Sequence, residues 1–405
     1  MNKVSSIIKY KENIIVYVFG FLTLVPILNF IHYINGPVNR GHQWYTAEWM
    51  INYNYGFIRR GLFGSFFIDL PFLPLEILYT ISLFIDLILI LYFYTVIKIF
   101  VKNKQNYLSY LLLVSPGFLM FTLSNLEYSF RKEILGLATF SCFLYSYNSK
   151  YKKTFLYLSV ILNLLGVFSA EYNIYFLMPI AFYIYFYDRK NLNYYVALYF
   201  SPLFIYFSLY FKSITKTENI SNLICNDLKN FNYYGDFCDG AILWLGYDIF
   251  ETINTTVSYY QSSPAYITYI FYAALVLSPF FFSDIFKNNL VLSVIFIFSF
   301  IPLFIISLDW GRHIYMIVSI FSILHFNNKD KTVTQLSTRT MKTYFFVFLY
   351  ISIPAFDPKF SDLFNPFNFL NKFTTLLNPL NIVEFVNSSF NLLYEIMRAV
   401  YFYFI

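Results

Sequence analysis

Residues 75–98 read LEILYTISLFIDLILILYFYTVIK, a run that is apolar and long enough to cross a lipid bilayer as a helix. The rest of the chain is similar: of 405 residues, 58% are hydrophobic and 12% are charged. That charged share is about half of what a soluble domain carries, and the mean hydropathy is +0.56. The sequence therefore predicts a polytopic integral membrane protein in which residues 1–405 form a single transmembrane domain.

The positions of the lysines predict how the chain crosses the bilayer. Lys3, Lys9 and Lys11 precede the first apolar stretch, so the positive-inside tendency places the N-terminus in the cytoplasm. Further lysines fall in alternate turns, which accounts for the net charge of +6 without a nucleic-acid partner. We expect an all-α bundle of about 11–12 transmembrane helices. The predicted spans are residues 14–34, 75–98, 106–123, 134–148, two short helices within 155–187, 193–212, 264–283, 290–308, 312–326 and 343–356, with an ambiguous final stretch.

Three segments are expected on the outer side of the membrane. Residues 35–74 are predicted to form a periplasmic re-entrant or interfacial segment, and residues 212–263 a large periplasmic loop. Residues 357–405 form a tail that either stays outside or returns into the membrane.

The three cysteines are too few for a disulfide framework. Cys225 and Cys238 both lie in the large outside loop, where they could be bridged in an oxidising compartment or remain reduced. Cys142 lies inside an apolar span and is expected to be inert.

Arginine and lysine have opposite distributions in this topology. Most lysines fall inside, whereas only two of eight arginines do, Arg189 and Arg339. A guanidinium binds phosphate oxygens in bidentate fashion and stays charged in a low-dielectric site. Arginine on the outer side therefore points to phosphate binding at the membrane edge. The outside arginines are Arg40, Arg59, Arg60, Arg131, Arg312 and Arg398.

The pair Arg59-Arg60 lies in an apolar, glycine-framed stretch, Asn54 to Gly64. We expect it to capture a lipid pyrophosphate, with the glycines allowing close backbone approach. The alternatives are an anchor to phospholipid headgroups, or salt bridges to the nearby acids Glu48 and Asp69. We favour the anion because two adjacent side chains of one element rarely both find internal acids.

Two further outside turns carry charge. In residues 124–133, Arg131 is expected to bind phosphate, with Glu127 or Glu133 acting as a base or orienting it. The alternative is a local Glu127 to Arg131 pair at i, i+4 spacing. Glu171 interrupts an apolar run between two short helices, and such a carboxylate near the membrane is costly unless it is paired or functional. The alternative is that Glu171 lies in a solvated turn at the surface and has no functional role.

The turn Asp309-Trp310-Gly311-Arg312-His313 combines a carboxylate, an aromatic platform, a guanidinium and an imidazole. Its spacing would let Asp309 face an acceptor hydroxyl while Arg312 meets a leaving phosphate. The alternative, compatible with the first, is an Asp309 N-cap with a salt bridge to Arg312.

Several classes of site are disfavoured by missing motifs. His32, His42 and His325 are scattered without ligand partners, which argues against a structural zinc site. The chain has no P-loop, HExxH or GxGxxG motif, so an ATP-driven enzyme or a cytosolic nucleotide-sugar transferase is disfavoured.

The architecture, with its 52 Phe and 40 Tyr and its outward arginines, resembles the bacterial O-antigen polymerases (Wzy) and related polysaccharide polymerases. The elements Tyr55 to Gly61 and Asp309 to Arg312 look like the arginine-bearing outside elements of that family. The resemblance extends to membrane-embedded GT-C glycosyltransferases.

This resemblance implies metal-independent glycosyl transfer at the periplasmic face of a bacterial inner membrane, without a cofactor. The donor and the acceptor would be undecaprenyl-pyrophosphate-linked glycans, and a chain-length regulator would be a possible partner. Arginines would hold the donor pyrophosphate, and a carboxylate would take the proton of the attacking hydroxyl. The large outside loop departs from the pattern because it has no arginine, which moves the expected site to the short turns.

Three other readings are open. A transferase that uses polyprenyl-phosphate sugars would show an acidic pair in its first outside loop, where this chain offers only Glu48 and Asp69. A flippase or other transporter would show charge at mid-membrane, whereas here nearly all charge sits at span ends. A membrane acyltransferase would need an embedded histidine, and His325 lies near an inside boundary.

Overall fold

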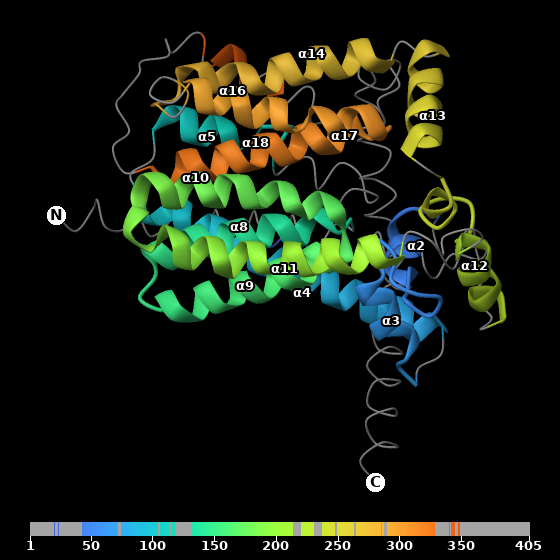
Figure 1. Cartoon of the computed structure of the whole chain (residues 1–405). Coiled ribbons are helices and arrows are strands. Elements are labelled where there is room, and N and C mark those ends of the chain that lie inside the picture. Colours follow the sequence, from blue (N-terminus) through green and yellow to red (C-terminus); the bar gives the residue numbers. More distant parts are fainter. Residues whose placement is uncertain are drawn as a thin grey trace, which may run out of the picture.

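Helices form all the elements in the described part of the chain (Figure 1). The computed structural model describes residues 43–71, 74–103, 106–113, 115–118, 131–213, 220–230, 237–247, 249–262, 265–284 and 290–328, with a few residues elsewhere. The prediction of an all-α fold is confirmed for this part. Most of the first predicted span and the whole of the tail at 357–405 lie outside the described residues.

Among the described residues, three helical stretches are long and apolar enough to cross a membrane. They are Glu76–Lys102 within α4 (Pro74–Lys102), Lys152–Ser169, which is the whole of α9, and Arg189–Phe211, which runs from η2 (Arg189–Asn191) into α11 (Leu192–Ser213). Two shorter apolar segments, Tyr269–Phe282 and Ser293–Ile306, lie later in the chain. The larger number of spans expected from the sequence stays a prediction.

The interruption predicted near residues 169–173 is present. Helix α9 ends at Ser169, a 3-10 helix η1 follows over Glu171–Phe176, and α10 continues over Leu177–Tyr187. The remaining bundle helices are α5 (Tyr107–Leu113), α8 (Glu133–Asn148), α14 (Ala265–Leu277) with η5 (Ser278–Phe282), α16 (Leu290–Ser299), α17 (Ile301–Ile306) and α18 (Trp310–Asn327).

Two predicted spans are divided differently in the structure. The span expected at residues 290–308 is two helices, α16 and α17, because Pro302 has no N–H to continue the hydrogen-bond ladder and begins a new helix instead. In the span expected at 106–123, the described residues form a helix, α5, that ends at Leu113 and a turn at residues 115–118.

Helix α8 lies at the centre of the bundle. Nearly all of its side chains are buried, and it packs against α4, α9 and α18. Hydroxyl groups link it to its neighbours: Thr95 of α4 donates to Ser141 at 2.8 Å, and Ser159 of α9 donates to the Thr139 carbonyl at 2.7 Å. Such short polar links hold helices together where both sides are apolar.

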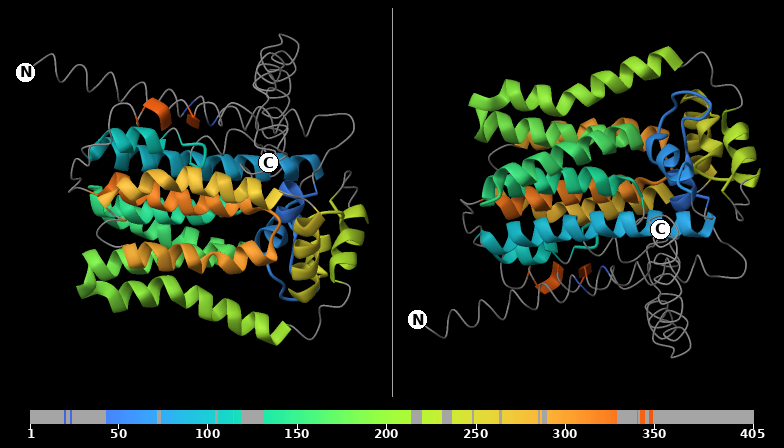
Figure 2. Two further views of the ribbon diagram at one scale, coloured as in Figure 1. Left: turned by 90° about the horizontal axis from the view of Figure 1, so that it is seen from above. Right: turned by 90° about the horizontal axis from the view of Figure 1, so that it is seen from below.

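Four short helices lie across one end of the bundle, which we call the capped end (Figures 1 and 2). They are α2 (Tyr45–Met50), α3 (Leu62–Ile68), α12 (Ile220–Asn230) and α13 (Ile249–Ser262). Much of the segment predicted as a large loop, residues 212–263, is therefore helical.

The two ends of the bundle carry different cations. At the far end, the Lys102 ammonium bonds to the Asn148 carbonyl, and the Asn148 side chain bonds to that of Asn327, so that α4, α8 and α18 finish together. This end also carries Lys150, Lys152, Lys153, Arg189 and Lys190. At the capped end, α8 begins at Glu133, α9 ends at Ser169 and α18 begins at Trp310. Arg131 and Arg312 lie beside two of these helix ends.

Candidate functional site

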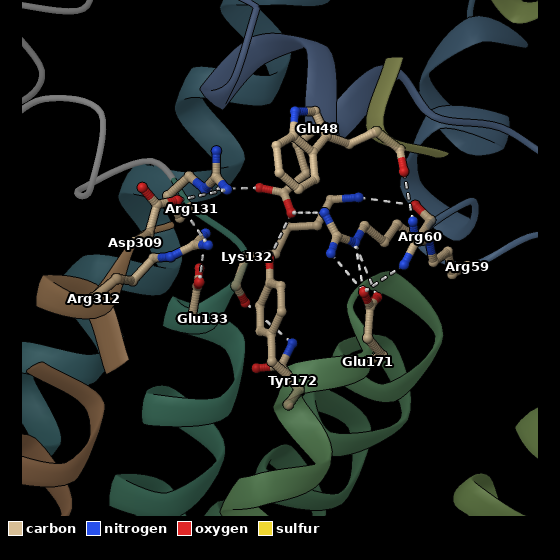
Figure 3. Close-up of polar contacts among 12 residues, drawn as sticks. Glu48, Arg59, Arg60, Arg131, Lys132, Glu133, Glu171, Tyr172, Asp309 and Arg312 are labelled. Carbon is tan, nitrogen blue, oxygen red and sulfur yellow. Dashed lines mark hydrogen bonds and ion pairs between the residues drawn. The ribbon is translucent and has the colours of Figure 1, made fainter. Parts of the chain in front are cut away.

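Side chains from five separate stretches meet at the capped end (Figure 3). Helix α2 supplies Glu48, the turn before α3 supplies Arg59 and Arg60, and the start of α8 supplies residues 131–133. Helix η1 supplies Glu171 and Tyr172, and the start of α18 supplies Asp309 and Arg312.

Arg60 has an unusual backbone conformation. Its φ is +72°, the only positive φ of a non-glycine residue in the described part of the chain. A side chain in this left-handed region costs free energy, so the surrounding structure must hold it there. The Lys132 ammonium does so in part, because it donates to the Arg60 carbonyl at 2.9 Å.

The Arg60 guanidinium is bound by two acids. Its Nε and Nη2 donate to both carboxylate oxygens of Glu171 at 2.5 to 3.0 Å, and its Nη1 lies 3.5 Å from Glu48 Oε1. Arg59 Nη1 lies 3.9 Å from Glu171 Oε1, and Arg59 Nη2 donates to the Trp244 carbonyl at 2.6 Å. The expectation that this pair would not find internal acids is wrong, because Glu171, distant in sequence, reaches both arginines.

A second group of ion pairs lies deeper. Arg131 Nε lies 3.1 Å from Glu48 Oε2, and Arg131 Nη2 lies 3.9 Å from Asp309 Oδ2. Arg312 Nη2 lies 3.0 Å from the same Asp309 oxygen, and Arg312 Nη1 lies 2.8 Å from Glu133 Oε1. All but Asp309 are buried.

These contacts join eight charges into one ion-pair chain of alternating sign: Arg59, Glu171, Arg60, Glu48, Arg131, Asp309, Arg312 and Glu133. Four arginines balance four carboxylates, and the buried Lys132 adds a fifth cation. The site with every group ionised therefore carries an excess of one positive charge. Two donors, Arg131 Nη1 and Arg312 Nε, are buried without a hydrogen-bond partner among the described residues.

Burial and the charges of neighbouring groups together set the pKa values in this site. Burial raises the pKa of Glu48, but Arg131, Arg60, Lys132 and Arg312 outweigh it and lower that pKa to about 2. Burial likewise opposes the pull of Arg60 and Arg59 on Glu171, whose pKa falls to about 2. Burial lowers the pKa of Lys132 to about 7 and raises that of Glu133 above its ordinary value.

Tyr172 and Asn173 hold the site together. The Tyr172 hydroxyl donates to Glu48 Oε1 at 2.6 Å, and its ring lies 5.4 Å from the Arg60 guanidinium and 5.5 Å from that of Arg312. The Asn173 side chain accepts from the Gly136 N–H and donates to the Lys132 carbonyl. Sequence reasoning missed both, and the only signal was their place beside Glu171 in the break of an apolar run.

The glycines of the arginine stretch have a packing role. A Cβ at Gly61 would collide with the Tyr53 ring, and one at Gly64 with the Ile51 backbone. The close approach that these glycines allow is thus to the protein's own chain, and the interpretation that they admit an anion is not supported at these two positions.

The structure brings together Arg59, Arg60, Arg131, Arg312, Glu171 and Asp309, all of which the sequence singled out. Asp309 is the N-cap residue of α18, but its side chain makes no capping hydrogen bond and pairs with arginines instead. Of the two acids expected near the arginine pair, Glu48 is a partner of Arg60. Glu127 lies outside the described residues.

A disulfide joins Cys225 of α12 to Cys238, with a Cα–Cα distance of 5.6 Å. Cys142 is free and buried. The segment after Cys238 leads to Trp244, whose carbonyl binds Arg59, so the disulfide ties α12 to one wall of the site. Within the described part of the chain, no three His, Cys, Asp or Glu side chains could together hold a metal ion.

Comparison of the chain with models of known families, with curated proteins and with solved structures found no match in any of the three.

Proposed function

We propose that the protein is a multi-pass glycosyltransferase of the bacterial inner membrane, with a cytoplasmic N-terminus, that polymerises lipid-linked oligosaccharide repeat units. It would use undecaprenyl-pyrophosphate-linked glycan as donor and as acceptor, without a metal ion. The membrane-length helices and the arginine cluster at one end of an all-helical bundle support this proposal. A GT-C-like architecture and association with a chain-length regulator are parts of the same proposal.

The observation that carries the proposal is the environment of Asp309. Its side chain is 30% exposed, and both arginine contacts are made to a single oxygen, Oδ2. Oδ1 has no ion pair or hydrogen bond among the described residues, so it can accept the proton of an acceptor hydroxyl. Glu171 is less suited to this role, because Arg60 occupies both of its oxygens.

The arginines would act on the leaving group. As the acceptor oxygen loses its proton to Asp309 and bonds to the anomeric carbon, the bond from that carbon to the lipid pyrophosphate breaks, and negative charge grows on the pyrophosphate. Arg59, which is 29% exposed, would meet that charge directly, and the buried Arg131 and Arg312, each with one donor that has no hydrogen-bond partner among the described residues, would stabilise it from behind.

The test is chromosomal deletion in the host, with the surface polysaccharide separated on a gel. A polymerase predicts a single-repeat product in place of long chains. Asp309→Asn should reproduce this product, because loss of a general base slows transfer by about 10²- to 10⁴-fold. Arg59→Ala and Arg312→Ala should do so through loss of phosphate binding.

Arg60→Gly is the informative variant at the strained position. Glycine adopts a positive φ at little cost, so the backbone is kept while the guanidinium is lost. Arg189→Ala, at the far end of the bundle, is the matched control and should leave long chains intact. Unaltered chains in the Asp309, Arg59, Arg60 and Arg312 variants together would rule the site out.

One observation favours a transporter as the second candidate. Nearly all charge in the sequence lies at span ends, which disfavours a transporter. Asp86, however, lies in the interior of α4, is 7% exposed, and its Oδ1 has no hydrogen-bond partner among the described residues. Buried carboxylates within membrane helices often belong to ion pathways. Loss of all surface sugar in both the deletion and Asp86→Asn would favour a flippase over a polymerase.

A further inference from the structure

Three aromatic rings gather beside the ion-pair chain. The ring centroids of Trp44 and Trp244 are 6.1 Å apart, and those of Trp244 and Tyr247 are 5.5 Å apart. All three side chains are partly exposed, unlike Trp49, which is fully buried in the bundle. We call these three rings the aromatic platform.

The platform is assembled from segments far apart in the chain. Trp44 precedes α2, whereas Trp244 and Tyr247 follow the disulfide at Cys238. The Ala241 N–H donates to the Gln43 carbonyl at 2.7 Å, and a Cβ at Gly240 would collide with the Gln43 backbone, so the two segments lie in direct contact. The rings are therefore held in place by backbone contacts and a covalent bond.

The residues of the platform contact both arginine groups of the site. At one side, the Trp244 carbonyl accepts a hydrogen bond from Arg59 at 2.6 Å. At the other side, the Arg131 guanidinium lies 5.8 Å from the centre of the Trp44 ring, and Arg131 in turn contacts Asp309. Arg59 and the Trp244 ring are thus joined through one hydrogen bond to the same residue, so a ligand whose phosphate met Arg59 would bind beside the platform.

In a lipid-linked glycan, the group next to the pyrophosphate is a sugar ring. A pyranose has a C–H face that packs on a flat aromatic ring, while its hydroxyls bond to polar groups at the edge. Binding sites for small molecules commonly combine such apolar, aromatic walls with a few fixed polar groups. The aromatic platform supplies the wall, and the partly exposed Arg59 and Asp309 supply the polar groups.

We propose that Trp44, Trp244 and Tyr247 form a sugar-binding subsite that holds a pyranose ring of the glycan beside the phosphate-binding arginines. This inference rests on the proposed function and names where the carbohydrate part of its substrate binds. The alternative role for such rings is to anchor the segment at the membrane surface, as interfacial tryptophan and tyrosine commonly do.

The experiment measures binding of two separate probes to the full chain in phospholipid nanodiscs. One probe is the lipid-free repeat-unit oligosaccharide released from the host's surface polysaccharide, and the other is undecaprenyl pyrophosphate without sugar. Trp244→Ala should weaken oligosaccharide binding by about tenfold, the loss expected when one stacking ring is removed. Binding of undecaprenyl pyrophosphate should be unchanged, because the carbonyl that binds Arg59 belongs to the backbone.

Trp244→Phe should retain most of the oligosaccharide affinity, and Tyr247→Ala should weaken it as Trp244→Ala does. Equal oligosaccharide affinity in the wild type and both alanine variants overturns the subsite and leaves the proposed function standing, provided that undecaprenyl pyrophosphate binds. Loss of both probes in Trp244→Ala also overturns it, because the rings would then serve only the fold of the segment. A wild-type protein that binds neither probe contradicts the proposed function itself.

Discussion

At the scale of single residues, the site is governed by pairing. Arg131, Arg312, Glu48 and Glu133 are buried, and a buried charge is tolerated only with a partner. Removing one member of such a pair typically costs about 3–5 kcal/mol, because the other charge stays buried alone. Arg60 is also strained in its backbone, so contacts with its surroundings must hold it in a conformation that the backbone itself disfavours.

The pairing makes stability depend on pH in a defined direction. Glu171 has a pKa of about 2 in the folded protein, whereas a glutamate in an unfolded chain titrates near ~4.3. Because the folded pKa is the lower, the stabilisation by Glu171 is fully present above ~4.3 and is lost as the pH falls towards about 2. Glu171→Gln should therefore be less stable than wild type at neutral pH, and the gap should narrow in acid.

Thermal unfolding in detergent from pH 7 down to pH 3 measures this gap. Asp69→Asn is the control, since Asp69 is exposed at the end of α3, outside the ion-pair chain, and it should follow the wild type at every pH. A gap between Glu171→Gln and the wild type that stays constant over this range would contradict the assignment.

At the scale of elements, the sequence predicted helices best where polar residues interrupt an apolar run. The polar stretch at residues 169–173 marks the end of α9, and the lysines near 150 mark the turn between α8 and α9. The division at Pro302 was missed because the apolar residues on both sides hide a backbone effect.

The site was predictable in part for the same reason. Charges in an apolar chain stand out, so Arg59, Arg60, Arg312 and Asp309 could be found from their spacing and neighbours. Their partners could not: Arg60 meets a glutamate 111 positions away, and no local pattern encodes that contact. Lys132 was likewise passed over, since its burial against the Arg60 carbonyl depends on tertiary packing.

The disulfide-linked element gives a prediction of its own. A Cys225→Ser, Cys238→Ser variant loses the link between α12 and the segment that carries Trp244. Closure of so short a loop contributes about 3 kcal/mol in the chain-entropy model, so the melting temperature should fall. Long-chain polysaccharide should fall with it, because Arg59 loses a fixed partner.

The measurement compares the double variant and Cys142→Ser by thermal unfolding and by polysaccharide gel. Cys142 is free, so its variant shows what loss of a thiol does without loss of a bridge. Wild-type melting and wild-type chain length in the double variant would show that the bridge has no part in holding the site.

At the scale of the whole molecule, the two ends of the bundle differ in the type of cation they carry. Lysines predominate at the far end, with Arg189 among them, and arginines predominate at the capped end, with the buried Lys132 among them. The disulfide also lies at the capped end. Lysine-rich turns favour the cytoplasmic side, and structural disulfides persist in oxidising compartments. Both facts predict that the capped end faces away from the cytoplasm.

Single cysteines in a Cys142→Ala background test this orientation. Asn254→Cys on α13 and Lys153→Cys at the start of α9 are both at exposed positions, one at each end of the bundle. A membrane-impermeant maleimide should label Asn254→Cys in intact spheroplasts and Lys153→Cys only after permeabilisation. Equal labelling of both in intact cells, or the reverse order, would contradict the proposed topology.

The alternation of charge along the ion-pair chain also limits how such a protein can evolve. Loss of Arg312 alone leaves Glu133 buried without an ion pair, and loss of Glu133 alone leaves the buried Arg312 with only its contact to Asp309. Loss of both together is close to neutral for stability when apolar side chains of similar volume replace them. Substitutions at positions 133 and 312 are therefore coupled, and lineages that change one of them would be under immediate selection to change the other.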